Sequence, residues 1–276
     1  MIRLLIAGML LASVYFSCGQ PAAVGETSGA DEAEKSAKTE TPIVVKNEPV
    51  ALDTTYTIDY IMGKFDPKSH PDFVLIETRY ADRAGLYLHR EVYDAFRQMY
   101  AAAKEAGITL IIRSATRNFN YQKGIWERKW TGRTPVDGQN LAKAVPDPKM
   151  RALKILEYSS MPGTSRHHWG TDIDFNSFDN SYFEQGEGKK IYDWLVKNAP
   201  TFGFCQTYTP KGEARPYGYN EEKWHWSYLP IAQQLTALAQ QHLKDEMIKG
   251  FQGAATAVEI GVVDKYVLGI NGDCLK

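Results

Sequence analysis

Two short segments most constrain what this chain can fold into. The first is Ser165–Asp174, with the sequence SRHHWGTDID, and the second is Glu222–Trp226, with the sequence EKWHW. Zinc binds neutral imidazole and carboxylate groups, and a catalytic zinc site uses three protein ligands and keeps a fourth position for water. The two segments together offer ligands of both kinds. A fold that uses them has to bring the segments side by side.

One possible ligand set consists of His167, Asp174 and His225. The step from His167 to Asp174 does not fit one face of a helix, so we expect a loop that enters a strand, with Gly170 at the turn. The residues from Thr171 to Phe175 alternate as in a strand, which places Asp172 and Asp174 on the same face. His225 would then come from a neighbouring element.

His168 and Asp172 form a second possible ligand pair in the same stretch, and ligand chemistry alone does not choose between the pairs. Glu222 lies three residues before His225, so it can lie beside a metal without binding it. A carboxylate in that place can take a proton from water and return it to a leaving amine. The alternative is that Glu222 is a surface charge in a turn.

Composition limits the classes of partner. The apolar content is 43%, which is ample for the core of one domain. The formal net charge is −1, whereas nucleic-acid-binding proteins usually carry a strong basic excess. We therefore expect no nucleic-acid partner.

The N-terminal residues resemble an export signal. A short charged start precedes an apolar run that is too short to span a bilayer comfortably, and Cys18 follows where a bacterial lipoprotein would be cut and lipidated. We predict an export signal over residues 1–18 and a lipid anchor at Cys18 as the only membrane contact. The alternative is plain secretion. The expected location is the periplasmic or cell-envelope side.

Residues 19–51 are rich in Ala, Glu, Thr, Ser and Lys and predict a flexible tether, because they cannot bury enough apolar surface to order themselves. The folded domain is predicted over 52–276. Helical spacing predicts helices at about 90–106, 121–130, 149–158, 189–198 and 230–249, and the apolar run 108–112 predicts a buried strand. Helices and a few strands mix without regular βαβ alternation, which indicates the α+β class.

Two cysteines, Cys205 and Cys274, remain in the predicted domain. In an exported protein they can pair, or they can stay as two buried thiols. The sequence does not distinguish these states, because pairing depends on the distance between the two Cα atoms.

The pattern Ser-x-His-x6-Asp followed by Glu-x-x-His resembles the D-alanyl-D-alanine carboxypeptidase family of zinc peptidases that includes the VanY type. The resemblance implies Zn²⁺ on His167, Asp174 and His225, with Glu222 as the catalytic base. It also implies a single α+β domain like that of these peptidases and the hedgehog signalling domain, with a small antiparallel sheet flanked by helices. Asp172 departs from the family pattern, since relatives mostly carry alanine there.

A third segment, Ser114–Gln122, resembles the family's Ser-x-x-Arg-x4-Gln pattern. The resemblance implies that Arg117 holds the substrate's terminal carboxylate, with Gln122 on the same wall and Ser165 donating a hydrogen bond. A planar guanidinium suits this task because it can form two parallel hydrogen bonds with a carboxylate.

These observations predict a zinc carboxypeptidase that removes the C-terminal D-alanine from peptidoglycan stem peptides. The alternatives are an L,D-carboxypeptidase or a D-Ala-D-Ala dipeptidase on related cell-wall peptides. A further alternative is a zinc-stabilised wall-binding module without catalysis.

Overall fold

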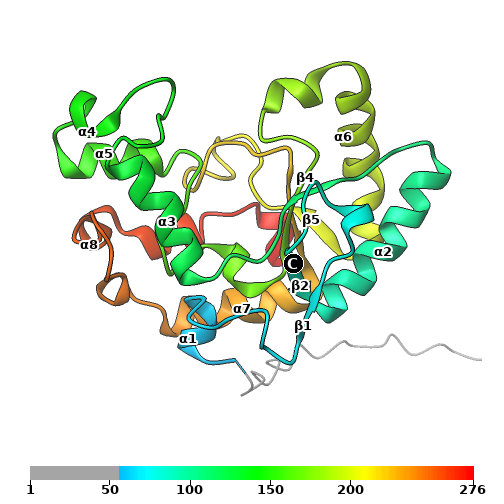
Figure 1. The fold of residues 1–276 in the computed structure, drawn as a ribbon, viewed down its shortest axis with the longest axis horizontal. Coiled ribbons are helices and arrows are strands. Elements are labelled where there is room, and N and C mark those ends of the chain that lie inside the picture. Colours follow the sequence, from blue (N-terminus) through cyan, green and yellow to red (C-terminus); the bar gives the residue numbers. More distant parts are fainter. Residues whose placement is uncertain (1–55) are drawn as a thin grey trace, which may run out of the picture. The chain divides into compact units, whose positions relative to one another are not determined.

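A four-stranded antiparallel sheet lies at the centre of the domain, in a computed structural model that describes residues 56–276 (Figure 1). The strand order is β3 (Ile112–Ser114), β4 (Asp172–Phe175), β6 (His225–Tyr228) and β5 (Phe204–Gln206). A separate hairpin pairs β1 (Phe73–Leu75) with β2 (Tyr87–His89). The predicted export signal with Cys18 and the predicted tether lie outside the described residues.

Helices surround this sheet. In Figure 1, α2 and α6 stand to the right of the strands, α3, α4 and α5 stand to the left, and α7 runs below them. Their bounds are α1 Ile58–Ile61, α2 Arg90–Glu105, α3 Phe119–Trp130, α4 Leu141–Ala144, α5 Pro148–Ile155, α6 Gly186–Asn198, α7 Leu229–His242 and α8 Thr256–Ile260. The predicted α+β class, with a small antiparallel sheet flanked by helices, is confirmed. None of the helices in residues 56–276 is both long and apolar enough to cross a membrane.

Helix α2 shows how the sequence pattern produces the packing. Val92, Phe96, Met99 and Ala103 recur every three or four residues, and all four side chains are fully buried. Gly107 follows the helix with φ of +74°, a conformation that glycine adopts without steric cost. The prediction for this helix is confirmed.

Two sequence-based predictions were wrong in their bounds by four residues or more, namely the strand at 108–112 and the last long helix. Ile108, Leu110 and Ile112 are buried as expected, but the strand begins only at Ile112. Ile111 instead forms two hydrogen bonds with Asn176. The backbone N–H of Ile111 donates to the side-chain Oδ1 of Asn176, and the backbone N–H of Asn176 donates to the carbonyl of Ile111. The backbone groups of this part of the run are therefore satisfied outside the ladder.

The last long helix is shorter than the predicted 230–249. Helix α7 ends at His242, because Leu243 turns to extended backbone and is buried. Asp245 then accepts a hydrogen bond from the backbone N–H of Val263 through its side chain. These contacts with later parts of the chain replace the helical hydrogen bonds that the local pattern predicted.

Helix α1 and the turn after it support the segment that carries His167. The Tyr60 hydroxyl donates to the carbonyl of Trp169 at 2.9 Å, and the Trp169 indole donates to the carbonyl of Ile61 at 3.1 Å. Gly63 lies against His168, and a Cβ atom at Gly63 would stand 2.5 Å from the imidazole ring. Only glycine therefore permits this close approach.

Cys205 and Cys274 form a disulfide, with their Cα atoms 5.7 Å apart. Cys205 lies on β5, so the bond joins the C-terminal segment to the central sheet. This settles the question that the sequence left open.

Candidate active site

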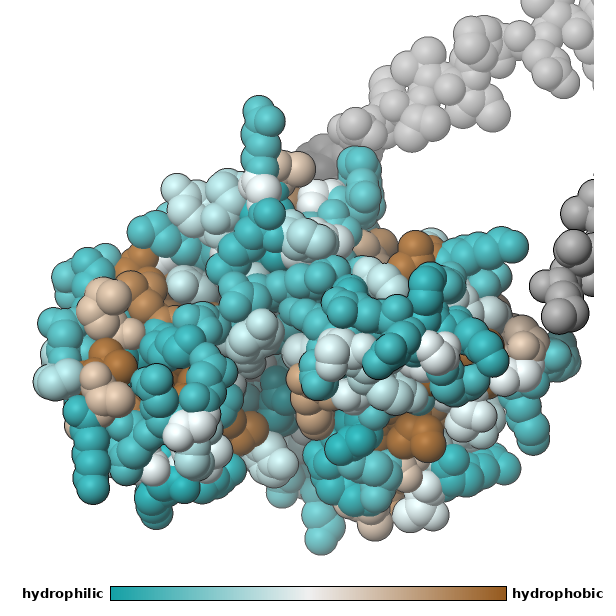
Figure 2. Space-filling model, turned by 90° about the horizontal axis from the view of Figure 1, so that it is seen from above, coloured by the Kyte–Doolittle hydropathy of each residue, from teal (hydrophilic) through white to brown (hydrophobic). Residues whose placement is uncertain are grey.

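A pocket of about 590 Å³ opens beside the ends of β4 and β6. In Figure 2 the surface is hollowed between the part with α4 and α5, on the left, and the part with α6, on the right. The pocket lining includes all seven side chains that the sequence assigned to the site: Arg117, Gln122, Ser165, His167, Asp174, Glu222 and His225.

His167, Asp174 and His225 converge in this pocket. One possible ligand atom from each residue lies within 4.8 Å of the other two, and all three residues are buried. Asp174 on β4 and His225 on β6 are direct cross-strand partners, and His167 comes from the 3₁₀ helix Arg166–Trp169. Gly170 ends that helix in the left-handed conformation and turns the chain into β4, as predicted.

The orientation of His167 favours a cation between its ring and Asp174. Its Nδ1 lies 2.8 Å from the carbonyl of Ala115, which can only accept a hydrogen bond, so Nδ1 carries the proton. Nε2 then presents a lone pair toward Asp174 Oδ2 at 3.2 Å. Within residues 56–276, neither His167 Nε2 nor Asp174 Oδ1 has a hydrogen-bond partner.

His225 is held in a similar way. Its Nε2 lies 2.7 Å from Asp172 Oδ2, which leaves Nδ1 at 3.3 Å from Asp174 Oδ1 and 3.1 Å from Glu222 Oε2. Burial lowers the pKa of His225, but the three carboxylates outweigh it and raise that pKa well above the ordinary value. Positive charge is therefore strongly favoured at this point.

These groups fit a zinc ion. Two imidazole nitrogens and one carboxylate oxygen form the donor set, and these atoms lie together in a buried space. Burial raises the pKa of Asp174, but the imidazoles of His167 and His225 outweigh it and hold the pKa well below the usual range. Asp174 is thus ionised, as a ligand must be.

Asp172 lies behind the cluster and does not join it. Its Oδ1 accepts hydrogen bonds from the hydroxyls of Ser227 at 2.6 Å and Thr171 at 2.7 Å, and its Oδ2 accepts from His225. A carboxylate that binds the far nitrogen of a ligand histidine fixes the tautomer and the orientation of the ring. Asp172 is therefore placed to orient His225.

Both ring nitrogens of His168 form hydrogen bonds with backbone groups. Its Nδ1 donates to the carbonyl of Arg117 at 2.5 Å, and its Nε2 accepts from the N–H of Gly163 at 3.0 Å. Both ring nitrogens are therefore in use and point away from the cluster. Burial lowers the pKa of His168 to about 3, so the ring is neutral.

Glu222 lies beside the cluster with its carboxylate next to His225 Nδ1. The side chain is buried and lines the pocket, so the alternative of a surface charge is wrong. Burial raises the pKa of Glu222. A carboxylate with a raised pKa is a better proton acceptor, which suits a base.

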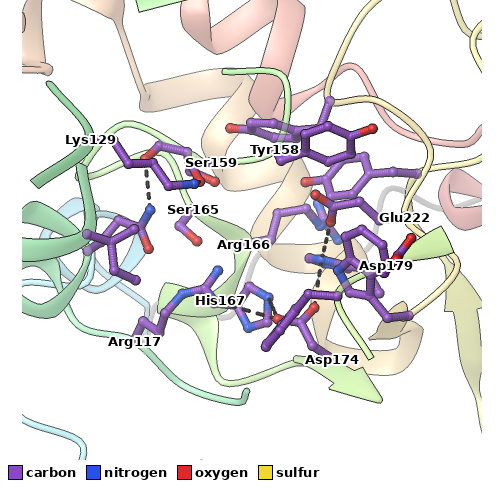
Figure 3. Close-up of a pocket in the computed structure, with 18 of the residues that line it drawn as sticks. Arg117, Lys129, Tyr158, Ser159, Ser165, Arg166, His167, Asp174, Asp179 and Glu222 are labelled. Atoms are coloured by element: carbon purple, nitrogen blue, oxygen red, sulfur yellow. Dashed lines mark hydrogen bonds and ion pairs between the residues drawn. The ribbon is translucent and has the colours of Figure 1, made fainter. Parts of the chain in front are cut away.

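Arg117 reaches the pocket from the segment after β3. Its Nη1 donates to Ser114 Oγ at 2.8 Å and lies 3.5 Å from Asp174 Oδ2, while Nε has no hydrogen-bond partner in the described part of the chain. Ser165 Oγ is also buried and without a partner there. Both residues have donors to offer a ligand. Figure 3 shows Ser165 and Arg117 on the same side of the pocket, facing Glu222 and Asp174.

Gln122 lines the same wall, and one end of its side-chain amide is already hydrogen-bonded within the protein. Its amide nitrogen donates to the carbonyl of Ser160 at 2.8 Å, and its Oε1 has no partner among residues 56–276. Sequence reasoning missed Lys129, which also lines the pocket. The signal was present, because Lys129 follows Gln122 by two helical turns on α3 and so shares its face.

The family model described as VanY, D-alanyl-D-alanine carboxypeptidase, matches residues 85–231, which is just over half of the chain. The chain belongs to this family. The matched stretch of this VanY-type chain includes every residue that the sequence assigned to the site.

Three individual relatives share between 22% and 26% sequence identity with this chain. The YodJ protein of Bacillus subtilis (strain 168) is 26% identical over 176 residues, which is 60% of this chain and 55% of YodJ. The chain thus spans about half the length of that relative. A solved structure of a mutant of the vancomycin resistance D,D-pentapeptidase VanY with Zn(II) is 24% identical, with 58% of this chain and 85% of that chain covered and a TM-score of 0.43. The LD-carboxypeptidase LdcB is 22% identical, with coverage of 63% and 75% and a TM-score of 0.44.

Proposed function

We propose that this protein is a zinc-dependent carboxypeptidase that removes the C-terminal D-alanine from peptidoglycan stem peptides. The observation that carries the proposal is the convergence of His167, Asp174 and His225, with Glu222 beside them and Arg117 in the same pocket. A buried ligand set, a buried base and a carboxylate-binding cation are the parts that removal of a C-terminal residue requires.

In this proposal His167, Asp174 and His225 would hold the zinc ion, whose chemistry there would be to polarise the scissile carbonyl and to lower the pKa of water. Glu222 accepts a proton from the attacking water and returns it to the amine that leaves. It can do so because it faces the cluster without being needed as a ligand.

Arg117 positions the substrate. Its guanidinium can form two hydrogen bonds with the terminal carboxylate of the peptide, and the Ser165 hydroxyl can donate another. The bond to be cut would then lie between this anchor and the metal ligands. Such an arrangement selects peptides with a free C-terminus.

Two alternatives use the same groups. An L,D-carboxypeptidase or a D-Ala-D-Ala dipeptidase would differ only in the residues next to the cleaved bond. A wall-binding module would need the zinc site but not the base. The buried Glu222 beside His225 favours an enzyme over a binding module, because burial of a carboxylate is costly without a use for it.

The proposed location is the cell envelope, with export through residues 1–18 and lipid attachment at Cys18. The test is detergent partitioning of the full chain and of Cys18→Ser from cells. Attachment predicts that the full chain enters the detergent phase and the variant does not. Equal partitioning of both would contradict it.

The activity test uses the purified protein, loaded with zinc or treated with a chelator, on defined muropeptides analysed by mass. We expect loss of one D-alanine from a pentapeptide by the zinc-loaded protein and no cleavage after chelation. Release of D-alanine from the tetrapeptide alone would indicate the L,D alternative, and cleavage of free D-Ala-D-Ala into two D-alanines would indicate the dipeptidase. A zinc-loaded protein that binds these peptides and cleaves none would be a binding module.

A further inference from the structure

Lys129 is a cation in the pocket that the proposed reaction does not use. It projects from α3 into the pocket lining, and its Nζ donates to Ser159 Oγ at 2.6 Å. In the described part of the chain Lys129 forms no ion pair. Asp137 also lines the pocket, but its carboxylate pairs with Lys154 at 2.6 Å. The ammonium group of Lys129 therefore has a hydroxyl partner and no paired carboxylate.

Lys129 lies on the opposite side of the pocket from Asp174 and Glu222 (Figure 3). Figure 3 shows Lys129 and Arg117 on one side of the pocket with Ser165 between them, and Asp174 and Glu222 on the other side. Arg117 lies near the carboxylate of Asp174, but Lys129 does not. This wall of the pocket thus carries two positive charges, and the one on Lys129 has no ion-pair partner among residues 56–276.

Electrostatics favours an anion beside Lys129. Burial and the positive charge of Arg117 lower the pKa of the Lys129 ammonium, and Glu222 and Asp137 offset this only in part. An ammonium group has three hydrogen-bond donors, and the contact with Ser159 uses one of them. A carboxylate from a ligand would accept the others and offset the cost of burial.

We propose that Lys129 and Ser159 form a subsite for a second substrate carboxylate, distinct from the C-terminal carboxylate that Arg117 binds. This inference rests on the proposed function and narrows its substrate class. The preferred substrate is a peptide in which the residue immediately before the terminal D-Ala or D-Ala-D-Ala carries a free side-chain carboxylate. Peptides with a neutral or cationic side chain at that residue bind less well.

The test compares matched peptides with Glu or Gln before D-Ala and before D-Ala-D-Ala, because these side chains differ in charge and hardly in size. Within the series that is cleaved, the wild type should show a KM about tenfold lower for the Glu peptide, the scale of one charge-assisted hydrogen bond. Lys129→Met should remove this preference, with kcat and the KM for the Gln peptide little changed. Lys129→Arg should retain most of it.

Lys123→Met is the matched control. Lys123 lies on the same helix, does not line the pocket and donates to the carbonyl of Gly250, so its loss should leave the preference intact. Equal KM values of the wild type for Glu and Gln peptides would overturn the subsite. An equal rise in KM for both peptides in Lys129→Met would also overturn it. That result would mean that Lys129 binds the terminal carboxylate together with Arg117 or has only a structural role.

Binding separates this inference from the proposed function. If no peptide is cleaved, calorimetric titration of the zinc-loaded protein with the same peptides still reports on the subsite. A preference for Glu that depends on Lys129 would keep the subsite while the proposed function fails. Binding without that preference would overturn the subsite as well.

Discussion

Arg166 and Asp172 form an ion pair in the interior, with 3.4 Å between Nε and Oδ2 and with both side chains almost fully buried. Arg166 also donates to the hydroxyls of Thr236 and Ser227, and its guanidinium lies over the ring of Trp169. Each charge compensates the other. Removal of one partner alone leaves an uncompensated buried charge, which is far more costly than replacement of both.

Asp172→Ala should therefore lower the free energy of unfolding by about 3–5 kcal/mol. The double variant Arg166→Met/Asp172→Ala should recover part of that loss, because no buried charge is left alone. Urea unfolding of the two single variants and the double variant gives the coupling. Strictly additive losses would show that the pair is not coupled.

The two neighbouring histidines should separate metal binding from stability. His167→Ala should lower zinc content, because it removes a proposed ligand whose Nε2 faces Asp174. His168→Ala should keep zinc and lose about 1–3 kcal/mol of stability, since both of its ring nitrogens form buried hydrogen bonds. Metal analysis after dialysis, with parallel unfolding curves, distinguishes them, and the reverse pattern would show that the wrong histidine was assigned.

Glu222→Gln should keep zinc and lose turnover. The amide preserves the shape of the side chain but cannot accept the proton, so we expect kcat to fall by about 10²–10⁴-fold. Metal content serves as the control, and steady-state hydrolysis of the best muropeptide is the measurement. Activity near that of the wild type would remove Glu222 from the role of base.

Arg117→Lys should weaken the reaction of peptides with a free C-terminus. Lysine keeps the charge but loses the paired hydrogen bonds of the guanidinium, and we expect kcat/KM to fall by about 100-fold. The same peptide with an amidated C-terminus should be a poor substrate for both proteins and change little between them. An equal loss on both peptides would contradict anchoring of the carboxylate.

Loss of the disulfide should affect stability and leave the site intact. Cys205 and Cys274 are 69 residues apart in sequence, and neither lines the pocket. Cys205→Ser/Cys274→Ser should lower the free energy of unfolding by about 4 kcal/mol, the entropic value for a loop of this length. Urea unfolding measures the loss. Zinc content should stay unchanged, and a variant that loses its zinc would show that the disulfide also shapes the site.

The sequence predicted the convergence at the site because its signals are local and chemical. Strand alternation placed Asp172 and Asp174 on one face, and a glycine marked the turn into the strand. The family resemblance then chose His167 over His168. The structure supplies the physical reason for that choice, since His168 uses both ring nitrogens in hydrogen bonds with backbone groups.

Features that depend on distant parts of the chain could not be predicted. Asn176 takes the hydrogen bonds of Ile111, so the apolar run 108–112 is mostly not a strand. Arg166 showed nothing in the sequence that marks it as a buried partner of Asp172. Whether Cys205 meets Cys274 likewise depended on where the C-terminal segment packs.

The support that Gly63 and Ile61 give to the segment with His167 has a consequence for how much of the chain the site requires. The family match begins at residue 85 and ends at residue 231, so it contains neither of these residues nor Cys274. A protein shortened to the matched stretch would lose both Gly63, which packs against His168, and Cys274, which forms the disulfide with Cys205. We therefore expect the smallest stable unit to be larger than the stretch by which the family is recognised.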